Sequence, residues 1–182
     1  MFASKTTTFI VFVRGQKDGT RKLVIRPSTD TRYTDGDWIV THDGDRISCE
    51  SCVPTDLRDF IAARTKRSSI NKVFIDEGHF YPDLESVVSV LLEDGIDVVV
   101  AGIDYNYERR PFENMKALEK YAKTIVQCHA ICDCGDVAPY TVLKKTVLKK
   151  NVNTSKSGEI IVGGAEKYGV SCGSQKCDAQ FH

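Results

Sequence analysis

The sequence predicts an α/β fold, with a parallel sheet flanked by helices and a small cysteine-containing domain after it. Residues 72–75 change from polar to apolar and residues 96–103 are almost continuously apolar, both typical of strands, while residues 84–95 between them repeat apolar positions at helical spacing. A strand, a helix and a strand in that order imply a right-handed parallel crossover. Towards the C-terminus the apolar segments give way to cysteines and polar loops. We therefore expect an α/β domain over residues 1–131 and a small domain over residues 132–182.

Length and charge restrict the classes of protein to consider. The chain has 182 residues, which suits one α/β domain with a small appendage. Its 25 Lys and Arg residues balance 25 Asp and Glu residues, so we expect no nucleic acid partner. We find no apolar segment long enough to cross a bilayer and no signal-peptide pattern, so we expect no membrane partner and a cytoplasmic location. Seven cysteines in that setting indicate reduced thiols, some of which could bind a metal.

The N-terminal third is predicted to alternate helices, strands and loops. Residues 6–14 are expected to form a helix after a phosphate-binding loop, and residues 21–25 a strand that Pro27 ends. A polar loop at residues 28–52 then precedes a helix at residues 56–63, whose apolar residues share one face.

The predicted strand at residues 72–75 ends in two adjacent acids, Asp76 and Glu77. The last side chains of a parallel strand enter the crevice at its carboxyl end, where ligands of open α/β folds bind. Gly78 allows a turn there, and Phe80 follows with a second aromatic residue beside it. Acids next to aromatic rings suit a metal–phosphate site beside a flat organic ring. A strand that merely ends in a polar turn would show the same pattern.

The second half of the α/β domain continues the alternation. A helix is expected to begin after Asp83 as its N-cap. Residues 113–123 are predicted as a further helix, and residues 124–131 as the last strand of the sheet. Arg109 and Arg110, beside aromatic residues, could clamp a phosphate, stack on a base, or belong to a solvated loop.

The C-terminal cysteines have the general layout of a zinc ribbon, in which two pairs across a hairpin bind one metal. Their spacing is irregular, and Cys128 or His129 could substitute as a ligand. Another pair, Cys49 and Cys52, has the spacing of half a zinc site, but no second pair lies at the usual distance. Residues 141–150 contain Thr-Val-Leu-Lys-Lys twice in succession, which suggests a β-hairpin arm. We predict a structural zinc ion on Cys132, Cys134, Cys172 and Cys177.

Eight short motifs occur in one order along nearly the whole chain. They are residues 1–7 (Met-Phe-Ala-Ser-Lys-Thr-Thr), 30–33 (Asp-Thr-Arg-Tyr), 41–43 (Thr-His-Asp), 75–80 (Ile-Asp-Glu-Gly-His-Phe), 101–104 (Ala-Gly-Ile-Asp), 109–112 (Arg-Arg-Pro-Phe), 140–141 (Tyr-Thr) and 163–168 (Gly-Gly-Ala-Glu-Lys-Tyr). In this order they resemble the type II thymidine kinases of animal cells, many bacteria and large DNA viruses. The resemblance implies ATP-dependent phosphorylation of thymidine at the 5′-hydroxyl, giving dTMP for nucleotide salvage. It also implies a P-loop-type domain and a small zinc-held domain with a flexible lasso over the nucleoside.

The resemblance further implies a role for individual residues. Glu77 would be the base that takes the proton of the 5′-hydroxyl, while positioning and charge stabilise the transferring phosphoryl group. The implied cofactors are ATP and Mg²⁺, and the implied partners are thymidine, ATP and further copies of the chain in a dimer or tetramer. Such an enzyme would work in the cytoplasm, that of the host if the source is viral. Its ATP and Mg²⁺ site would consist of Lys5, Thr6, Asp30, Arg32 and Asp76. Its thymidine site would consist of Met1, Phe80, Ile103, Tyr107, Thr141, Ile161 and Tyr168.

The chain departs from the family pattern in its phosphate-binding loop. Ser4 stands where the family has glycine, and the strand that precedes the loop in the family is not in the sequence. We expect either that the reading frame starts upstream of Met1 or that the chain is a weakened nucleotide-binding relative of the kinases. Without that strand, we also expect an unpaired edge beside the acidic strand. A third interpretation is a zinc-ribbon protein that binds nucleic acid; the cysteines and the Lys-rich segment favour it, and the balanced charge opposes it.

Overall fold

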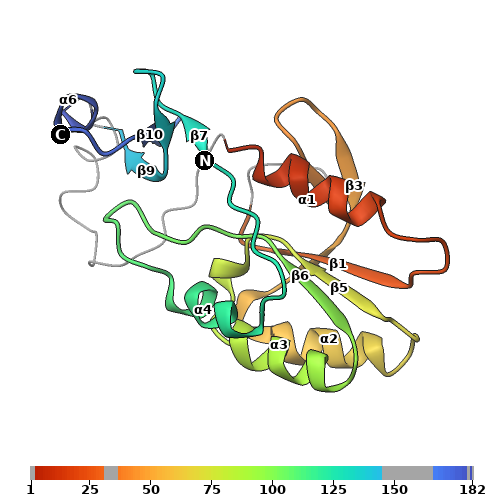
Figure 1. Cartoon of the computed structure of the whole chain (residues 1–182). Helices are drawn as coiled ribbons and strands as arrows, with labels where there is room; N and C mark the ends of the chain where they lie inside the picture. Colours follow the sequence, from red (N-terminus) through yellow and green to blue (C-terminus); the bar gives the residue numbers. More distant parts are fainter. Residues whose placement is uncertain (1–2, 31–36, 145–165, 180, 182) are drawn as a thin grey trace. The chain divides into compact units, whose positions relative to one another are not determined.

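A computed structural model of the chain describes residues 3–30, 37–144, 166–179 and 181 (Figure 1). The chain divides into two compact units. The larger unit consists of Thr6–Asp104 and Phe112–Ile125, and the smaller unit of Met1–Lys5, Tyr105–Pro111 and Val126–His182. Within the larger unit, the backbone N–H of Phe112 donates to the backbone oxygen of Asp104 at 2.8 Å. This hydrogen bond joins the two points at which the chain leaves the larger unit and returns to it, before and after residues 105–111.

The larger unit is built on a four-stranded parallel sheet with the order β4-β1-β5-β6. The acidic strand β5 therefore has a hydrogen-bonded partner on both sides. The expectation of an unpaired edge beside it is wrong, because β1 pairs along its full length. The strands are β1 (Lys22–Pro27), β4 (Glu50–Cys52), β5 (Lys72–Ile75) and β6 (Asp97–Val100).

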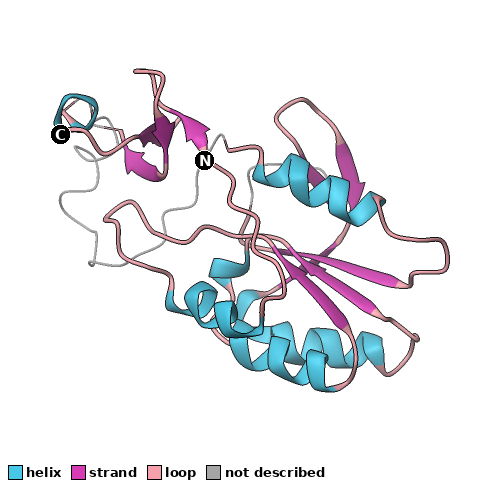
Figure 2. Ribbon diagram, viewed as in Figure 1, coloured by secondary structure: helices cyan, strands magenta, loops and turns pink. Residues whose placement is uncertain are grey.

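Helices cover both faces of this sheet (Figure 2). Helix α1 (Lys5–Arg14) lies on one face, close to a hairpin of β2 (Trp38–Val40) and β3 (Arg46–Ser48). Helices α2 (Leu57–Thr65) and α3 (Leu84–Glu93) lie on the other face. This arrangement confirms the predicted α/β class.

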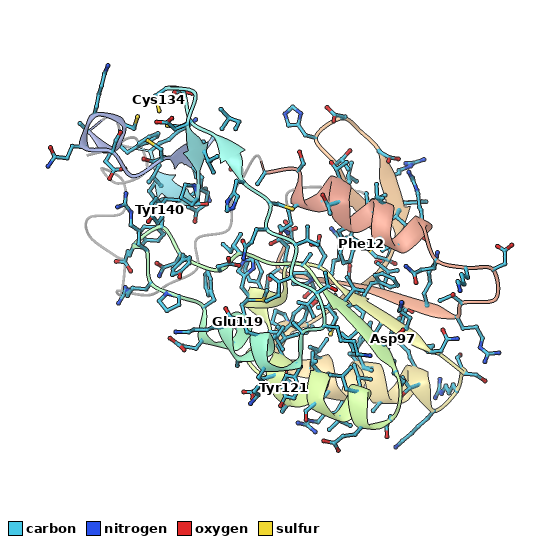
Figure 3. All side chains as sticks on the ribbon, viewed as in Figure 1. Phe12, Asp97, Glu119, Tyr121, Cys134 and Tyr140 are labelled. Atoms are coloured by element: carbon cyan, nitrogen blue, oxygen red, sulfur yellow. The ribbon has the colours of Figure 1, made fainter. Side chains whose placement is uncertain are left out.

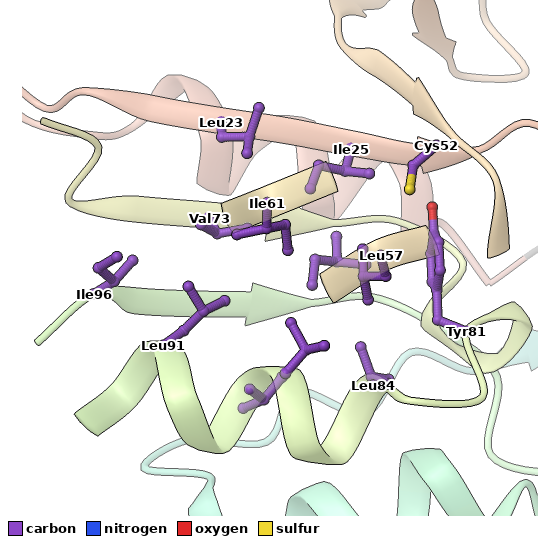
Figure 4. Close-up of a cluster of buried hydrophobic side chains, with 13 residues drawn as sticks. Leu23, Ile25, Cys52, Leu57, Ile61, Val73, Tyr81, Leu84, Leu91 and Ile96 are labelled. Atoms are coloured by element: carbon purple, nitrogen blue, oxygen red, sulfur yellow. The ribbon is translucent and has the colours of Figure 1, made fainter. Parts of the chain in front are cut away.

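Alternate side chains of the central strands join different cores. In β5, Val73 and Ile75 belong to the core under α2 and α3, whereas Phe74 belongs to the core under α1. Because both faces of the sheet are covered, the strand is apolar and buried from Val73 to Ile75. Figure 4 shows the larger core, in which the ring of Tyr81 points toward Cys52.

Two expectations about secondary structure in this unit are wrong. Residues 28–52 hold β2, β3 and β4 instead of a loop alone, because strands of three residues are too short to show a periodic pattern. Residues 113–123 form two short helices instead of one, namely α4 (Glu113–Lys116) and the 3₁₀ helix η3 (Ala117–Tyr121).

The predicted last strand of the sheet, at residues 124–131, is also wrong. Only β7 (Ala130–Ile131) is a strand, and it pairs with β8 (Val137–Ala138) in the smaller unit. Ile125 and Val126 are more than half exposed. A strand of a sheet covered on both faces would bury such side chains.

The smaller unit has two antiparallel two-stranded sheets and a short helix. The first sheet is the β7–β8 pair, and the second joins β9 (Tyr140–Leu143) to β10 (Tyr168–Ser171). Helix α6 (Gln175–Asp178) follows. Residues 141–143 of the first copy of the repeated pentapeptide thus pair with β10, and the second copy lies outside the described residues. Among the described helices, none combines the length and the apolar character needed to cross a membrane.

Candidate functional site

A pocket of about 40 Å³ lies at the carboxyl ends of β1 and β5 in the larger unit. This is the edge at which open parallel sheets bind their ligands. Three residues expected to bind ATP and Mg²⁺ meet here: Thr6 from the first turn of α1, Asp30 from the loop after β1, and Asp76 directly after β5. The complete lining is Thr6, Arg26, Asp30, Trp38, Ile39, Val40 and Asp76.

The two carboxylates set the electrostatics of the pocket. Asp30 is 7% exposed and Asp76 is 4% exposed. Arg26, which lines the same pocket, places a positive charge beside them. Carboxylate and hydroxyl oxygens are also the ligands that Mg²⁺ prefers, together with substrate phosphates. Thr6, Asp30 and Asp76 therefore fit a magnesium ion.

Arg26 lines the same pocket and was missed in the sequence analysis. Its Nε donates to Ser51 Oγ at 3.1 Å, and its Nη1 donates to the backbone oxygen of Asp30 at 3.4 Å. These bonds fix the guanidinium at the pocket, and a fixed guanidinium suits a phosphate ligand. The available signal was a charged residue within an otherwise apolar strand.

Glu77 adopts an uncommon backbone conformation directly beside the pocket. Its φ of 49° and ψ of 45° are left-handed, a region that non-glycine residues seldom adopt. Its N–H donates to Oδ1 of Asp76 at 2.9 Å, so the two acids are coupled through the backbone. The side chain is buried, with only 5% of the residue exposed. Strained backbone of this kind concentrates at functional sites.

His79 lies next to the Glu77 carboxylate. Nδ1 of His79 is 3.6 Å from Oε2 of Glu77, and both side chains are buried. The imidazole contacts two phenyl rings, with centroids 4.5 Å away for Phe80 and 4.9 Å away for Phe112. Phe80, one of the residues expected to contact thymine, is half-buried. The turn after β5 thus joins an acid, an imidazole and an aromatic ring.

The start of α1 has the conformation that the family's glycine would favour. Ser4, immediately before Lys5, has a φ of 52°, in the left-handed region. Lys5 is the first residue of α1 and is half-buried. Ile103, beyond the end of β6, is half-buried as well. Met1, Arg32 and Ile161 lie outside the described residues.

The smaller unit contains the other residues expected to bind thymidine. Tyr168 is buried in β10, and this burial, with a smaller contribution from Tyr107, raises the pKa of Tyr168 to about 12. Thr141 lies in β9, paired with Val170. Tyr107 and Thr141 are half-buried.

Arg109 and Arg110 make different contacts. Arg109 has a φ of 61°, and its guanidinium stacks on the ring of Tyr140 with 4.3 Å between the guanidinium carbon and the ring centroid. Its Nη2 also lies 2.5 Å from Oδ2 of Asp178. Arg110 pairs with Glu108. Arg109 therefore stacks on a ring of the protein itself, which was not among the alternatives expected.

Four cysteines of the smaller unit converge, as expected for a metal site. The Sγ atoms of the group all lie within 4.8 Å of one another, and the Cys134 and Cys172 Sγ atoms are 3.7 Å apart (Figure 3). Tetrahedral zinc with Zn–S distances of about 2.3 Å would separate its sulfurs by about 3.8 Å. Hydrogen bonds from Ser174 lower the pKa of Cys172 to about 6. A backbone hydrogen bond from Asp136 lowers the pKa of Cys134, but hydrogen bonds with the other cysteines outweigh it and raise that pKa to about 12, so a bound cation is what would hold all four groups as thiolates. The cluster of Cys132, Cys134, Cys172 and Cys177 can therefore hold zinc.

The irregular spacing of these cysteines is explained by two tight turns. Gly135 and Gly173 have φ of 92° and 87°, in the region that favours glycine. By contrast, Cys49 and Cys52 belong to the two separate cores of the larger unit. They are in no group of three or more metal-ligand side chains among the described residues. Burial raises the pKa of Cys49 to about 12 and that of Cys52 to about 11.

The fold and the site define an α/β protein with a pocket at the carboxyl ends of parallel strands and a smaller unit that contains a cluster of four cysteines. The family model for thymidine kinase matches residues 1–177, and the chain belongs to the thymidine kinase family. The resemblance of the motifs is thereby confirmed. A thymidine kinase of Pseudothermotoga lettingae is 31% identical over 94% of this chain and 88% of its own length. That of Variola virus is 33% identical over 97% and 91%, and the human cytosolic thymidine kinase is 33% identical over 94% and 68%.

Proposed function

We propose that this protein transfers the γ-phosphoryl group of ATP to the 5′-hydroxyl of thymidine, giving dTMP for nucleotide salvage. The observation that supports it most directly is the pair of buried acids after β5. Asp76 lines the pocket with Thr6 and Asp30, and Glu77 is the next residue along the chain. Family membership gives the substrate class, and the acids give the chemistry.

Glu77 is the base in this proposal. Its carboxylate accepts the proton of the 5′-hydroxyl as the oxygen attacks the γ-phosphorus, and the bond to the β-phosphate oxygen breaks. Thr6, Asp30 and Asp76 would hold Mg²⁺, which supplies charge to neutralise the phosphates. Arg26 adds a fixed positive charge at the same pocket. Because phosphoryl transfer depends mainly on positioning and charge, these groups suffice for the reaction.

The remaining site residues have supporting roles in the proposal. Lys5 and Arg32 would contact the phosphates. Zinc on the four clustered cysteines would hold the smaller unit together, and the enzyme would act in the cytoplasm as a dimer or tetramer. Thymidine would be bound by Met1, Phe80, Ile103, Tyr107, Thr141, Ile161 and Tyr168.

A product assay tests this function. Purified chain is incubated with thymidine, ATP and Mg²⁺, and the nucleotides are separated and identified by mass spectrometry. We expect dTMP and ADP in equal amounts, and no dTMP when thymidine is replaced by its 5′-deoxy analogue. Binding of both substrates without dTMP would favour the weakened, non-catalytic relative and would contradict the proposal.

A further inference from the structure

We propose that Asn114 is a positioning residue for the turn that holds Glu77; this rests on the proposed role of Glu77 as the base. Asn114 lies in α4, remote in sequence from that turn. Its Nδ2 donates to three backbone oxygens, those of Gly78 at 3.2 Å, His79 at 3.3 Å and Tyr81 at 2.7 Å. Three carbonyl groups of one turn thus converge on a single amide nitrogen.

The chemistry of these oxygens fixes the orientation of the amide. Carbonyl oxygens only accept hydrogen bonds, so the NH₂ group of Asn114 must face them. Its Oδ1 accepts instead from the backbone N–H of Met115 at 3.0 Å. The amide has two N–H bonds for three acceptors. One N–H donates to the nearest oxygen, that of Tyr81, and the other is shared between the oxygens of Gly78 and His79. Asp at this position would place a carboxylate against three acceptors.

The turn has few hydrogen bonds of its own. It contains η2 (Gly78–Phe80), a 3₁₀ helix of one turn. The N–H of Phe80 donates to Glu77 O, and the N–H of Tyr81 donates to Gly78 O, both at 3.0 Å. Glu77 itself is in the left-handed conformation. A strained residue keeps such a conformation only when surrounding contacts enforce it. The amide of Asn114 supplies three such contacts from outside the turn.

The residues on either side of Asn114 reinforce the same contact. The ring of Phe112 lies against His79, with centroids 4.9 Å apart. The sulfur of Met115 would lie only 3.0 Å from a Cβ added at Gly78, so it packs tightly against the turn. Residues 112–115 therefore support the turn as a unit, in which Asn114 supplies the hydrogen bonds.

Loss of the amide should affect turnover more than nucleotide binding. Without it the turn can rotate, and a small displacement of a reacting group can cost about 100-fold in rate. Thr6 and Asp30, on other elements, would still hold ATP and its metal. We therefore expect kcat to fall about 10- to 100-fold in Asn114→Ala, and further in Asn114→Asp, with the KM for ATP within about two-fold.

Two control variants separate positioning from stability. Lys116→Ala changes an exposed residue of the same helix and should leave kcat unchanged. Leu118→Ala removes side-chain packing against the main core without touching the turn, so it should lower Tm while the folded enzyme keeps its kcat. If Asn114→Ala retains kcat within about three-fold, or if Leu118→Ala loses as much kcat as Asn114→Ala, the positioning role is refuted.

Amide hydrogen exchange of Phe80 and Tyr81, followed by NMR, reads the turn without any substrate. We expect exchange at both amides to be at least about ten-fold faster in Asn114→Ala and unchanged in Leu118→Ala. If the unmodified chain makes no dTMP, the proposed function fails. The positioning role is then tested by exchange alone, and it is refuted if the amides of Phe80 and Tyr81 exchange at the same rate in Asn114→Ala as in the unmodified chain. If the chain makes dTMP but Asn114→Ala changes neither kcat nor exchange, only the positioning role fails.

Discussion

A methyl group added at Gly78 would clash with a stiff neighbouring side chain. A Cβ at this position would lie 2.6 Å from Val100 Cγ1, 3.0 Å from Met115 Sδ and 3.1 Å from Leu84 Cδ2. Val100 is β-branched and stiff at χ1, so the clash cannot be relieved by a simple rotation. The turn after Glu77 or the strand β6 must move instead. Gly78→Ala should therefore disturb both the core and the base.

Gly102 provides a matched control. A Cβ there would meet Met115, with Cε at 2.6 Å and Sδ at 2.8 Å, and would otherwise make only an ordinary contact at 3.5 Å. The end of a methionine side chain is flexible and can move away at little cost. Overpacking at a stiff site costs about 1–3 kcal/mol, which corresponds to about 2–12 °C in Tm for a chain of this size. We expect Gly78→Ala to lower Tm by an amount within this range, and Gly102→Ala to lower Tm by no more than about 2 °C.

Thermal unfolding of the two variants, followed by circular dichroism, measures this difference, and steady-state kinetics measure the effect on the base. Gly78→Ala should lose kcat as well as Tm, whereas Gly102→Ala should lose less of each, because only the flexible end of Met115 has to move. Equal Tm values for the two variants, or a larger loss in Gly102→Ala, would refute the reasoning from Val100.

The cysteines and Ser4 offer three further tests. Cys177→Ser should lower bound zinc from one atom per chain to nearly none, measured by mass spectrometry of the metal, whereas Cys128→Ser should keep it; retained zinc in Cys177→Ser would rule out the cluster. Ser4→Gly should relieve a left-handed serine and stabilise the chain by about 1 kcal/mol in urea unfolding, and no gain would mean that the residue is unstrained. Because the pKa of Cys49 is raised to about 12 and that of Cys52 to about 11, both thiols stay protonated at pH 8 and should react with iodoacetamide only after unfolding; modification of either in folded protein would contradict their burial.

The acidic end of β5 could be predicted because its signal is local. Three apolar residues followed by Asp76 and Glu77 indicate a buried strand with acids at its tip, and the structure has this strand inside the sheet. The sequence could not show that β1 would pair beside it, because pairing depends on contacts between distant segments. The strand β4 was missed for a different reason, since three residues are too few to show a period.

Side chains whose roles depend on distant partners were the hardest to predict. Asn114 has no local pattern that marks it, because its acceptors lie in the turn after β5. Arg26 was not singled out in the sequence, and one of the two groups that fix it at the pocket, Ser51, lies 25 residues away. The cysteine cluster was predicted in spite of its spacing, and the turns at Gly135 and Gly173 explain how irregular pairs still converge.

The role of Glu77 as the base is the central claim, and Glu77→Gln tests it most directly. This substitution keeps the size of the side chain and removes its capacity to accept the proton. We predict that thymidine binding, measured by calorimetry, stays within about three-fold, while kcat for dTMP formation falls by about two to four orders of magnitude. A variant that binds thymidine and retains kcat within about ten-fold of the unmodified enzyme would contradict the account.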